Sequence, residues 1–139
     1  MVKSVYLAHP HAQQEAGLVY QTILEKAGLR VVNPFQRPEQ AEFEASFAGA
    51  GLSDPQCQRI VDMDLRKIED TDGIVALLID HDMVGTMMEV FYASRILHRP
   101  VLSVIGLRRY RTHPWIKNLT TMVPEGASLT DFVKGWMNE

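Results

Sequence analysis

The sequence predicts an α/β fold, with one parallel sheet of about five strands and helices on both faces. Apolar, β-branched-rich runs alternate along the chain with stretches of helical period, as in repeated strand–helix units. The run Gly73–Ile79 is apolar throughout, as in a parallel strand that is buried on both faces. No repeat or composition shift divides the 139 residues. We therefore expect a single Rossmann- or flavodoxin-like domain over residues 1–139.

Each expected element follows from the local residue pattern and from residues such as glycine and proline that end helices and strands. Gly28 ends the first helical stretch, and Pro34 closes the second strand. The expected strands are Lys3–Ala8, Leu29–Asn33, Gly73–Ile79, Pro100–Ile105 and Thr121–Val123, and the expected helices are Ala12–Ala27, Pro55–Asp70, Thr86–Leu97 and a terminal helix capped at Ser128. The pattern lapses between Phe35 and Asp54, and a connection of that length is typical of a functional lid.

Composition excludes several classes of function. The chain is 46% hydrophobic and 22% charged with a net charge of −3, so it offers no general basic field to nucleic acid. It has no apolar run near the roughly 20 residues that span a bilayer, and its start shows no signal-peptide pattern. Cys57 is the one cysteine, which excludes an internal disulfide. These features predict a cytoplasmic protein without membrane or nucleic-acid partners.

Glu89 is the first candidate for a reactive group. It follows the loop after the buried run Gly73–Ile79, and ligands of open α/β sheets bind at the carboxyl ends of such strands. A carboxylate there can act as nucleophile or base. The segment Thr86–Glu89 also fits a capping box, in which Glu89 only satisfies free amides at a helix start.

Asp64 is the second candidate. In the expected helix Pro55–Asp70, it shares the inward face with the stripe Ile60, Val61, Leu65 and Ile68, whereas Asp62, Arg66, Lys67 and Glu69 are expected to face solvent. A carboxylate on an apolar stripe is costly unless it is satisfied, so it favours the rim of a cavity. The alternative is a structural aspartate paired with a buried amide or hydroxyl.

Tyr6 lies late in the first strand, near the same edge of the sheet, where its phenol can hold a carboxylate. The alternative is a half-buried tyrosine with its hydroxyl in water. His9 and His11 lie in the following loop, and their H-x-H spacing has no third ligand at a helical interval. We therefore expect a solvated loop there and no metal. Dinucleotide, P-loop and G-x-S-x-G motifs are absent.

These residues together resemble the nucleoside 2-deoxyribosyltransferase family. The resemblance rests on Val5–Ala8 with its tyrosine, on Asp64–Asp72 and on the block Gly85–Glu89, with supporting matches at Tyr92-Ala93 and Arg99-Pro100-Val101. It covers most of the chain outside residues 36–57. It implies transfer of a 2-deoxyribosyl group between nucleobases through a covalent glycosyl-glutamate intermediate, a role in nucleotide salvage, and no cofactor.

The resemblance also implies roles for single residues. Glu89 matches the nucleophile, Asp64 the aspartate that contacts the base and assists proton transfer, and Tyr6 the tyrosine that orients the nucleophile. Asn118 resembles an asparagine that reaches into a neighbouring subunit's site. The substrate-binding residues expected on this basis are Ala8, His9, Phe35, Gln36, Asp82, Gly85, Thr86 and Asn118. The small-molecule partners are then a nucleoside and a free nucleobase.

Two departures from the family pattern bear on the substrate. Met83 stands where the family often has an aspartate, and Asp82 lies one residue early. A related branch hydrolyses 2'-deoxynucleoside 5'-monophosphates and binds phosphate through serine and arginine in the first loop. This loop lacks both, which argues against that branch, but its two histidines are an alternative contact for a phosphate. The expected lid, with Phe43 and Phe47, can stack on a base.

Two other functions stay open from the sequence. One is an N-glycoside hydrolase of 2'-deoxynucleosides or 2'-deoxynucleoside 5'-monophosphates, with water as acceptor. The other is a non-catalytic nucleotide-binding domain. Apolar residues beyond what one sheet face needs favour a homo-oligomer with sites near subunit interfaces, although one domain's core is an alternative place for them. These residues are Met87, Met88, Phe91, Tyr92 and Trp115.

Overall fold

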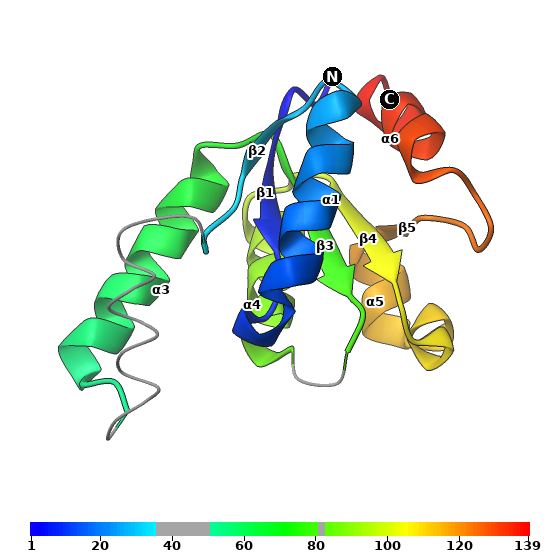
Figure 1. Ribbon diagram of the computed structural model, residues 1–139. Helices are drawn as coiled ribbons and strands as arrows, with labels where there is room; N and C mark the ends of the chain where they lie inside the picture. The colour runs from blue at the N-terminus through cyan, green and yellow to red at the C-terminus, as the bar shows by residue number, and fades with distance from the viewer. Residues whose placement is uncertain (36–50, 81–82) are drawn as a thin grey trace.

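The computed structural model describes residues 1–35, 51–80 and 83–139 (Figure 1). The elements in chain order are β1 (Ser4–Ala8), the 3-10 turn η1 (His11–Gln13), α1 (Gln14–Lys26), β2 (Arg30–Val32), α3 (Asp54–Glu69), β3 (Gly73–Leu78), α4 (Val84–Phe91), the π-helical turn η2 (Tyr92–Ile96), β4 (Val101–Ile105), the 3-10 turn η3 (Arg108–Thr112), α5 (Pro114–Leu119), β5 (Thr121–Met122) and α6 (Leu129–Met137). Gln36, Phe43, Phe47 and Asp82, for which the sequence predicts substrate contacts, lie outside the described residues.

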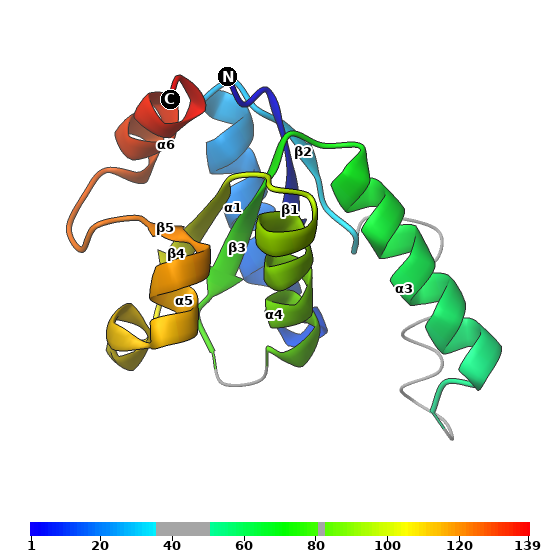
Figure 2. The ribbon, with the colours of Figure 1, turned by 180° about the vertical axis from the view of Figure 1, so that it is seen from behind.

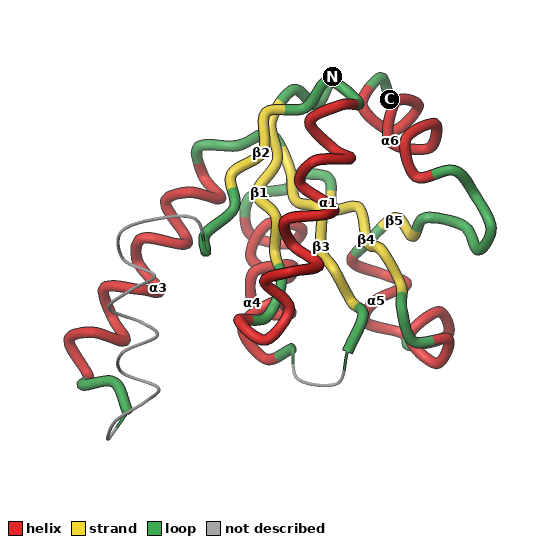
Figure 3. Tube along the Cα trace, in the orientation of Figure 1, coloured by secondary structure: helices red, strands yellow, loops and turns green. Residues whose placement is uncertain are grey.

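The sheet has five strands in the order β2-β1-β3-β4-β5, and every pairing between neighbours is parallel. This flavodoxin-like arrangement confirms the predicted fold class, and the tube in Figure 3 shows the strands fanned through the middle of the molecule. β1 and β3 are central and fully buried. Their carboxyl ends therefore lie side by side where a ligand of this fold binds.

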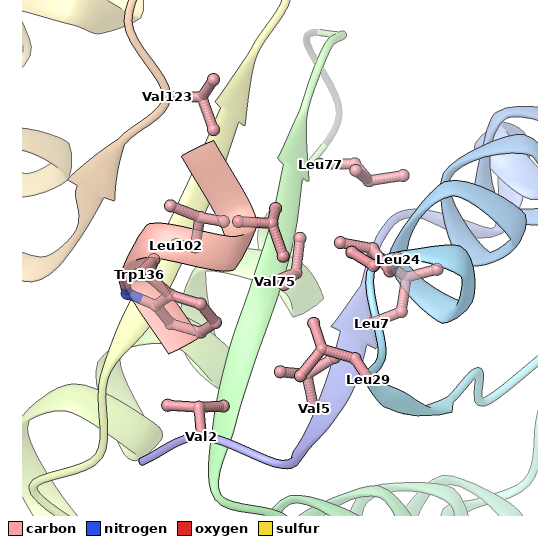
Figure 4. Packing of buried hydrophobic residues seen from close by; sticks show 12 residues of the cluster. Val2, Val5, Leu7, Leu24, Leu29, Val75, Leu77, Leu102, Val123 and Trp136 are labelled. Atoms are coloured by element: carbon pink, nitrogen blue, oxygen red, sulfur yellow. The ribbon is translucent and has the colours of Figure 1, made fainter. Parts of the chain in front are cut away.

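Helices cover both faces of the sheet, and strand alternation sends successive side chains to opposite faces (Figures 1 and 2). In β1, Val5 and Leu7 pack in the core beneath α1 and α6, where they meet Leu24 and Trp136 (Figure 4). Tyr6 and Ala8 face the second core, which α3, α4 and α5 cover with apolar side chains that include Ile68, Val90 and Ile116. The alternation thus places Tyr6 on the face that carries the candidate site.

α3 begins with strong capping and lies apart from the sheet over much of its length. Ser53 and Gln56 form a capping box, with Pro55 in the first turn. Only Lys67 and Ile68 of this helix are buried, and Figure 2 shows its first turns leaning away from the sheet. Val61, expected on the inward stripe, is instead 54% exposed. Only the last turns of α3 contribute to the core.

Two predicted elements need correction. The third long helix begins at Val84, with Met83 as its N-cap and no side-chain cap, so Thr86 and Glu89 lie inside the helix and form no capping box. Between the expected strands Pro100–Ile105 and Thr121–Val123, where no helix was expected, the chain contains η3 and α5. α5 starts with Pro114, and the His113 side chain caps it by accepting from the amide of Trp115. A helix this short leaves no clear periodic pattern.

Within the described ranges 1–35, 51–80 and 83–139, no helix combines the length and apolar character needed to cross a membrane.

Candidate functional site

Glu89 lies on α4 at the margin of its buried face. Thr86, one turn earlier, is 2% exposed, whereas Val84, Met88 and Phe91 are exposed on the opposite side of the helix. Loss of hydration on burial raises the pKa of the Glu89 carboxyl to about 8. Burying a carboxyl group away from water costs free energy, and such groups are often kept because function requires them.

Tyr6 approaches the same carboxyl group from the sheet. It lies on β1 between Ile74 of β3 and Val32 of β2, and its side chain is fully buried. The half-exposed alternative for Tyr6 is therefore wrong. A hydrogen bond with the Tyr6 hydroxyl lowers the pKa of Glu89, against the larger effect of burial. The phenol thus favours the ionised carboxylate and fixes its position.

α3 supplies charges of both signs to the site. Asp64 acts electrostatically on Glu89 and raises its pKa, whereas Lys67 lowers it. The Lys67 Nζ lies 3.6 Å from Asp64 Oδ1, and the two side chains are 10% and 28% exposed respectively. Asp64 is half-buried, as expected for its place on the inward face of the helix, and its charge acts on Glu89.

Lys67 was expected in solvent, and that expectation is wrong. A lysine can bury its long apolar stem and still deliver its ammonium group to a polar partner. The sequence offered one usable signal, because Lys67 lies three residues after Asp64 and so on a neighbouring side of the same helix.

Two polar atoms in this place lack hydrogen-bond partners. Thr86 Oγ1 and Glu89 Oε2 are buried, and neither has such a partner in the part of the chain that the structure describes. Buried polar atoms are nearly always paired, so each exception needs an explanation. A polar ligand between α3, α4 and β1 would supply both partners.

Arg99 fixes the end of α3 that carries Asp64 and Lys67. Its guanidinium donates to the carbonyl oxygens of Ile68, Glu69 and Thr71, where the helix ends. These are carbonyl groups that a helix end otherwise leaves unpaired. Because Arg99 follows η2, the contact locks the end of α3 to the segment that continues α4. The two helices that hold the site are thereby fixed together.

The first loop was expected to be solvated, and for His9 that is wrong. His9 is 3% exposed, and its Nε2 lies 3.1 Å from Asn33 Oδ1. Its ring packs against Phe35 at a centroid distance of 4.9 Å. Burial lowers the pKa of His9, with a smaller contribution from His11. His9 therefore shapes the wall of the sheet edge as a neutral ring beside the buried Ala8.

Two further predicted site residues, Gly85 and Asn118, lie at exposed positions. Gly85 is exposed at the start of α4. Asn118 is exposed on α5, where its side chain accepts a hydrogen bond from Arg95. It lines a cavity of about 320 Å³ between α4 and α5, together with Phe91, Arg95, Pro114, Trp115 and Leu119. In this single chain, Asn118 therefore lies in a separate groove from the group around Glu89.

A metal site finds no support in the described residues. Over residues 1–35, 51–80 and 83–139, no group of three or more His, Cys, Asp or Glu side chains is placed to hold a metal ion.

Comparisons with solved structures identify proteins that share this fold. A 2-deoxyribosyltransferase from the psychrotolerant bacterium Bacillus psychrosaccharolyticus superposes with a TM-score of 0.67 at 19% identity, covering 94% of this chain and 90% of that one. The chain has the fold of a 2-deoxyribosyltransferase. A conserved protein from Enterococcus faecalis V583 superposes with a TM-score of 0.62 at 16% identity, over 98% of this chain and 99% of that one. No protein-family model and no curated protein matches the sequence.

Proposed function

We propose that this protein is a nucleoside 2-deoxyribosyltransferase, with Glu89 as nucleophile. The observation that carries the proposal is the buried Glu89 carboxyl, in contact with Tyr6 and within the field of Asp64, on the fold of a 2-deoxyribosyltransferase. A structural role for Glu89 through capping is removed, because α4 begins two residues before Thr86. Retaining glycosidases likewise use two carboxyl groups at the bond that breaks, one as nucleophile and one as acid.

The reaction proceeds in two displacements. The Glu89 carboxylate attacks C1' of a 2'-deoxynucleoside from the face opposite the base. The C1'–N bond breaks, its electron pair stays on the base nitrogen, and that nitrogen takes a proton from Asp64. The free base leaves a 2-deoxyribosyl ester on Glu89. A second base attacks C1', gives its proton to Asp64 and releases the carboxylate, so the configuration at C1' is retained.

Tyr6 and Thr86 serve the same step from fixed positions. The Tyr6 hydroxyl stabilises the ionised form of Glu89 and holds it toward C1'. Thr86 Oγ1, buried one turn away without a partner in the described part of the chain, is suited to a hydroxyl group of the sugar. Both contacts come from regular elements, β1 and α4, so the geometry is set before substrate arrives.

The first loop favours a nucleoside over a nucleoside monophosphate. His9 is buried, and its lowered pKa keeps the ring neutral at pH 7, so it offers no positive charge to a phosphate. His9 and Phe35 instead form an aromatic wall at the carboxyl edge of β1 and β2. Ala8, His9 and Phe35 would then line the sugar or base, with Gln36, Asp82 and Gly85 as further substrate contacts.

Base exchange separates the transferase from the alternatives. 2'-Deoxyinosine is incubated with the protein, with and without adenine, and the products are separated by liquid chromatography. A transferase yields 2'-deoxyadenosine only when adenine is present. An N-glycoside hydrolase yields hypoxanthine and free deoxyribose in both mixtures, and a non-catalytic nucleotide-binding domain leaves 2'-deoxyinosine intact. Either of the last two results overturns the transferase.

The proposal includes a homo-oligomer. Met88, Phe91 and Trp115 are 67%, 40% and 60% exposed, and the rings of Phe91 and Trp115 lie 6.4 Å apart. They border the groove that contains Asn118. Burial of this apolar surface against a second copy would bring Asn118 close to the neighbouring subunit, in the role that the family resemblance implies.

A further inference from the structure

Lys67 is a buried cation that the proposed chemistry does not yet use. It is 9% exposed in a helix whose first turns are open to solvent, and its stem lies beside Ile68 in the face that meets the sheet. Few lysines are buried to this extent without a partner that requires them. Its Nζ lies 3.6 Å from Asp64 Oδ1, and its charge lowers the pKa of Glu89.

Two carboxylates that share one dry site repel each other when both are ionised. The two-step reaction needs that repulsion to be controlled, because Glu89 must be ionised to attack while Asp64 holds the proton for the leaving base. The groups that act on the Glu89 carboxyl are the Tyr6 hydroxyl from β1 and both Asp64 and Lys67 from α3. Among them Lys67 alone carries a positive charge.

We infer that Lys67 is a positioning residue, which uses its buried ammonium group to hold the Asp64 and Glu89 carboxyl groups in place for the attack on C1'. Its charge favours the ionised form of Glu89, which is the form that attacks. The inference rests on the proposed function, and it assigns to that site a residue in addition to Tyr6, Asp64 and Glu89. Lys67 acts through the carboxyl groups and not on the substrate. Lys67 lies on the last, buried turns of α3. Hydrogen bonds from Arg99 hold this end of the helix against the segment that follows η2, and so fix the ammonium group relative to α4.

The test compares Lys67→Met with Lys67→Arg, and uses Arg66→Met as the matched control. Arg66 is the next residue on the same helix and is exposed. The first readout is the titration of the Glu89 carboxyl carbon by ¹³C NMR, assigned by its loss in Glu89→Gln. Removal of the cation should raise the titration midpoint by about 1 in pH, since a nearby opposite charge changes the pKa of a carboxyl by about 1–3.

The second readout is the pH profile of base exchange. In Lys67→Met, the ascending limb of kcat/KM should move upward with the Glu89 midpoint, and kcat at pH 7 should fall about tenfold while KM changes little. Lys67→Arg should restore most of kcat, and Arg66→Met should match the wild type. If Lys67→Met does not fold, Lys67→Gln carries the same measurements.

The outcomes separate this inference from the proposed function. A purely structural ion pair predicts that Lys67→Met loses stability while the Glu89 midpoint and the pH limb stay in place, and that result overturns the inference. If the wild type exchanges no bases, the transferase proposal fails. The NMR titration still decides whether Lys67 sets the ionisation of Glu89, and an unchanged midpoint would again overturn it.

Discussion

The Tyr6 hydroxyl and the Glu89 carboxyl meet where β1 faces α4, and each comes from a buried part of its own element. Tyr6 lies one residue from Val5 and Leu7, which point into the opposite core. The side-chain alternation of a single strand therefore aims the phenol at the site. Both groups belong to regular elements, and the chemistry proposed for Glu89 depends on their relative position.

The raised pKa of Glu89 predicts how stability changes with pH. Its carboxyl group is protonated in the folded state up to about pH 8, whereas in the unfolded chain it ionises near 4.5. The contribution of Glu89 to the free energy of unfolding is therefore fully present below about pH 4.5, and it is lost as pH rises through about 8. A difference of one in pKa between the two states corresponds to about 1.4 kcal/mol, so the loss over this range amounts to several kcal/mol.

Glu89→Gln should remove that loss. Chemical unfolding from pH 4.5 to 8 should show the stability of the variant rising steadily relative to wild type, with a constant difference above pH 8. Glu25→Gln, at an exposed position on α1, provides the control and should follow the wild-type curve. Parallel curves for Glu89→Gln and wild type would mean that Glu89 is hydrated and ordinary.

Asp64→Asn should slow base exchange without loss of the fold. The amide keeps the shape of the carboxyl but cannot pass a proton to the departing base, and general acid catalysis is typically worth about 10²–10⁴-fold. kcat should fall by about that factor, with KM little changed. Asp62→Asn, exposed on the same helix, is the matched control. Equal rates for the two variants would assign Asp64 a structural role.

The close approach of Gly17 to His9 predicts opposite effects for two helical glycines. A Cβ at Gly17 would lie 2.5 Å from His9 Nε2, and the ring is held by Asn33, so it cannot move away freely. Gly17→Ala should therefore destabilise by about 1–3 kcal/mol. At Gly135 in α6 nothing lies within 4 Å of a Cβ, so Gly135→Ala should stabilise by about 0.5–1 kcal/mol. Denaturant melts of both variants test this, and a stable Gly17→Ala protein would show that His9 is not fixed.

The exposed apolar residues on α4 and α5 predict self-association. Light scattering at micromolar concentration should give a mass above the 15.7 kDa of one chain. Trp115→Glu should lower that mass, because a charge cannot be buried in an apolar interface without a partner. Leu18→Glu, at an exposed position on α1, is the control. A strict monomer that still exchanges bases would refute the shared site and leave the Glu89 chemistry standing.

Much of the fold followed from the sequence, because the interior strands β1 and β3 are buried on both faces and so form continuous apolar runs with clear ends. The phase of Asp64 on α3 was equally visible, since Ile68 on its stripe is buried. Lys67 was missed because helical patterns assign lysine to solvent, while its stem is apolar. The burial of His9 depends on Gly17, a contact between a loop and a helix that no local pattern encodes.

The covalent state of Glu89 during turnover distinguishes the proposed double displacement from any other reaction. The protein is mixed with a 2'-deoxynucleoside, quenched in acid within a turnover and digested, and the peptides are measured by mass spectrometry. We expect a 2-deoxyribosyl ester on Glu89, which disappears when free base is added before the quench and never forms in Glu89→Ala. Base exchange by Glu89→Ala, or turnover by the wild type with the ester on another residue, would contradict this expectation.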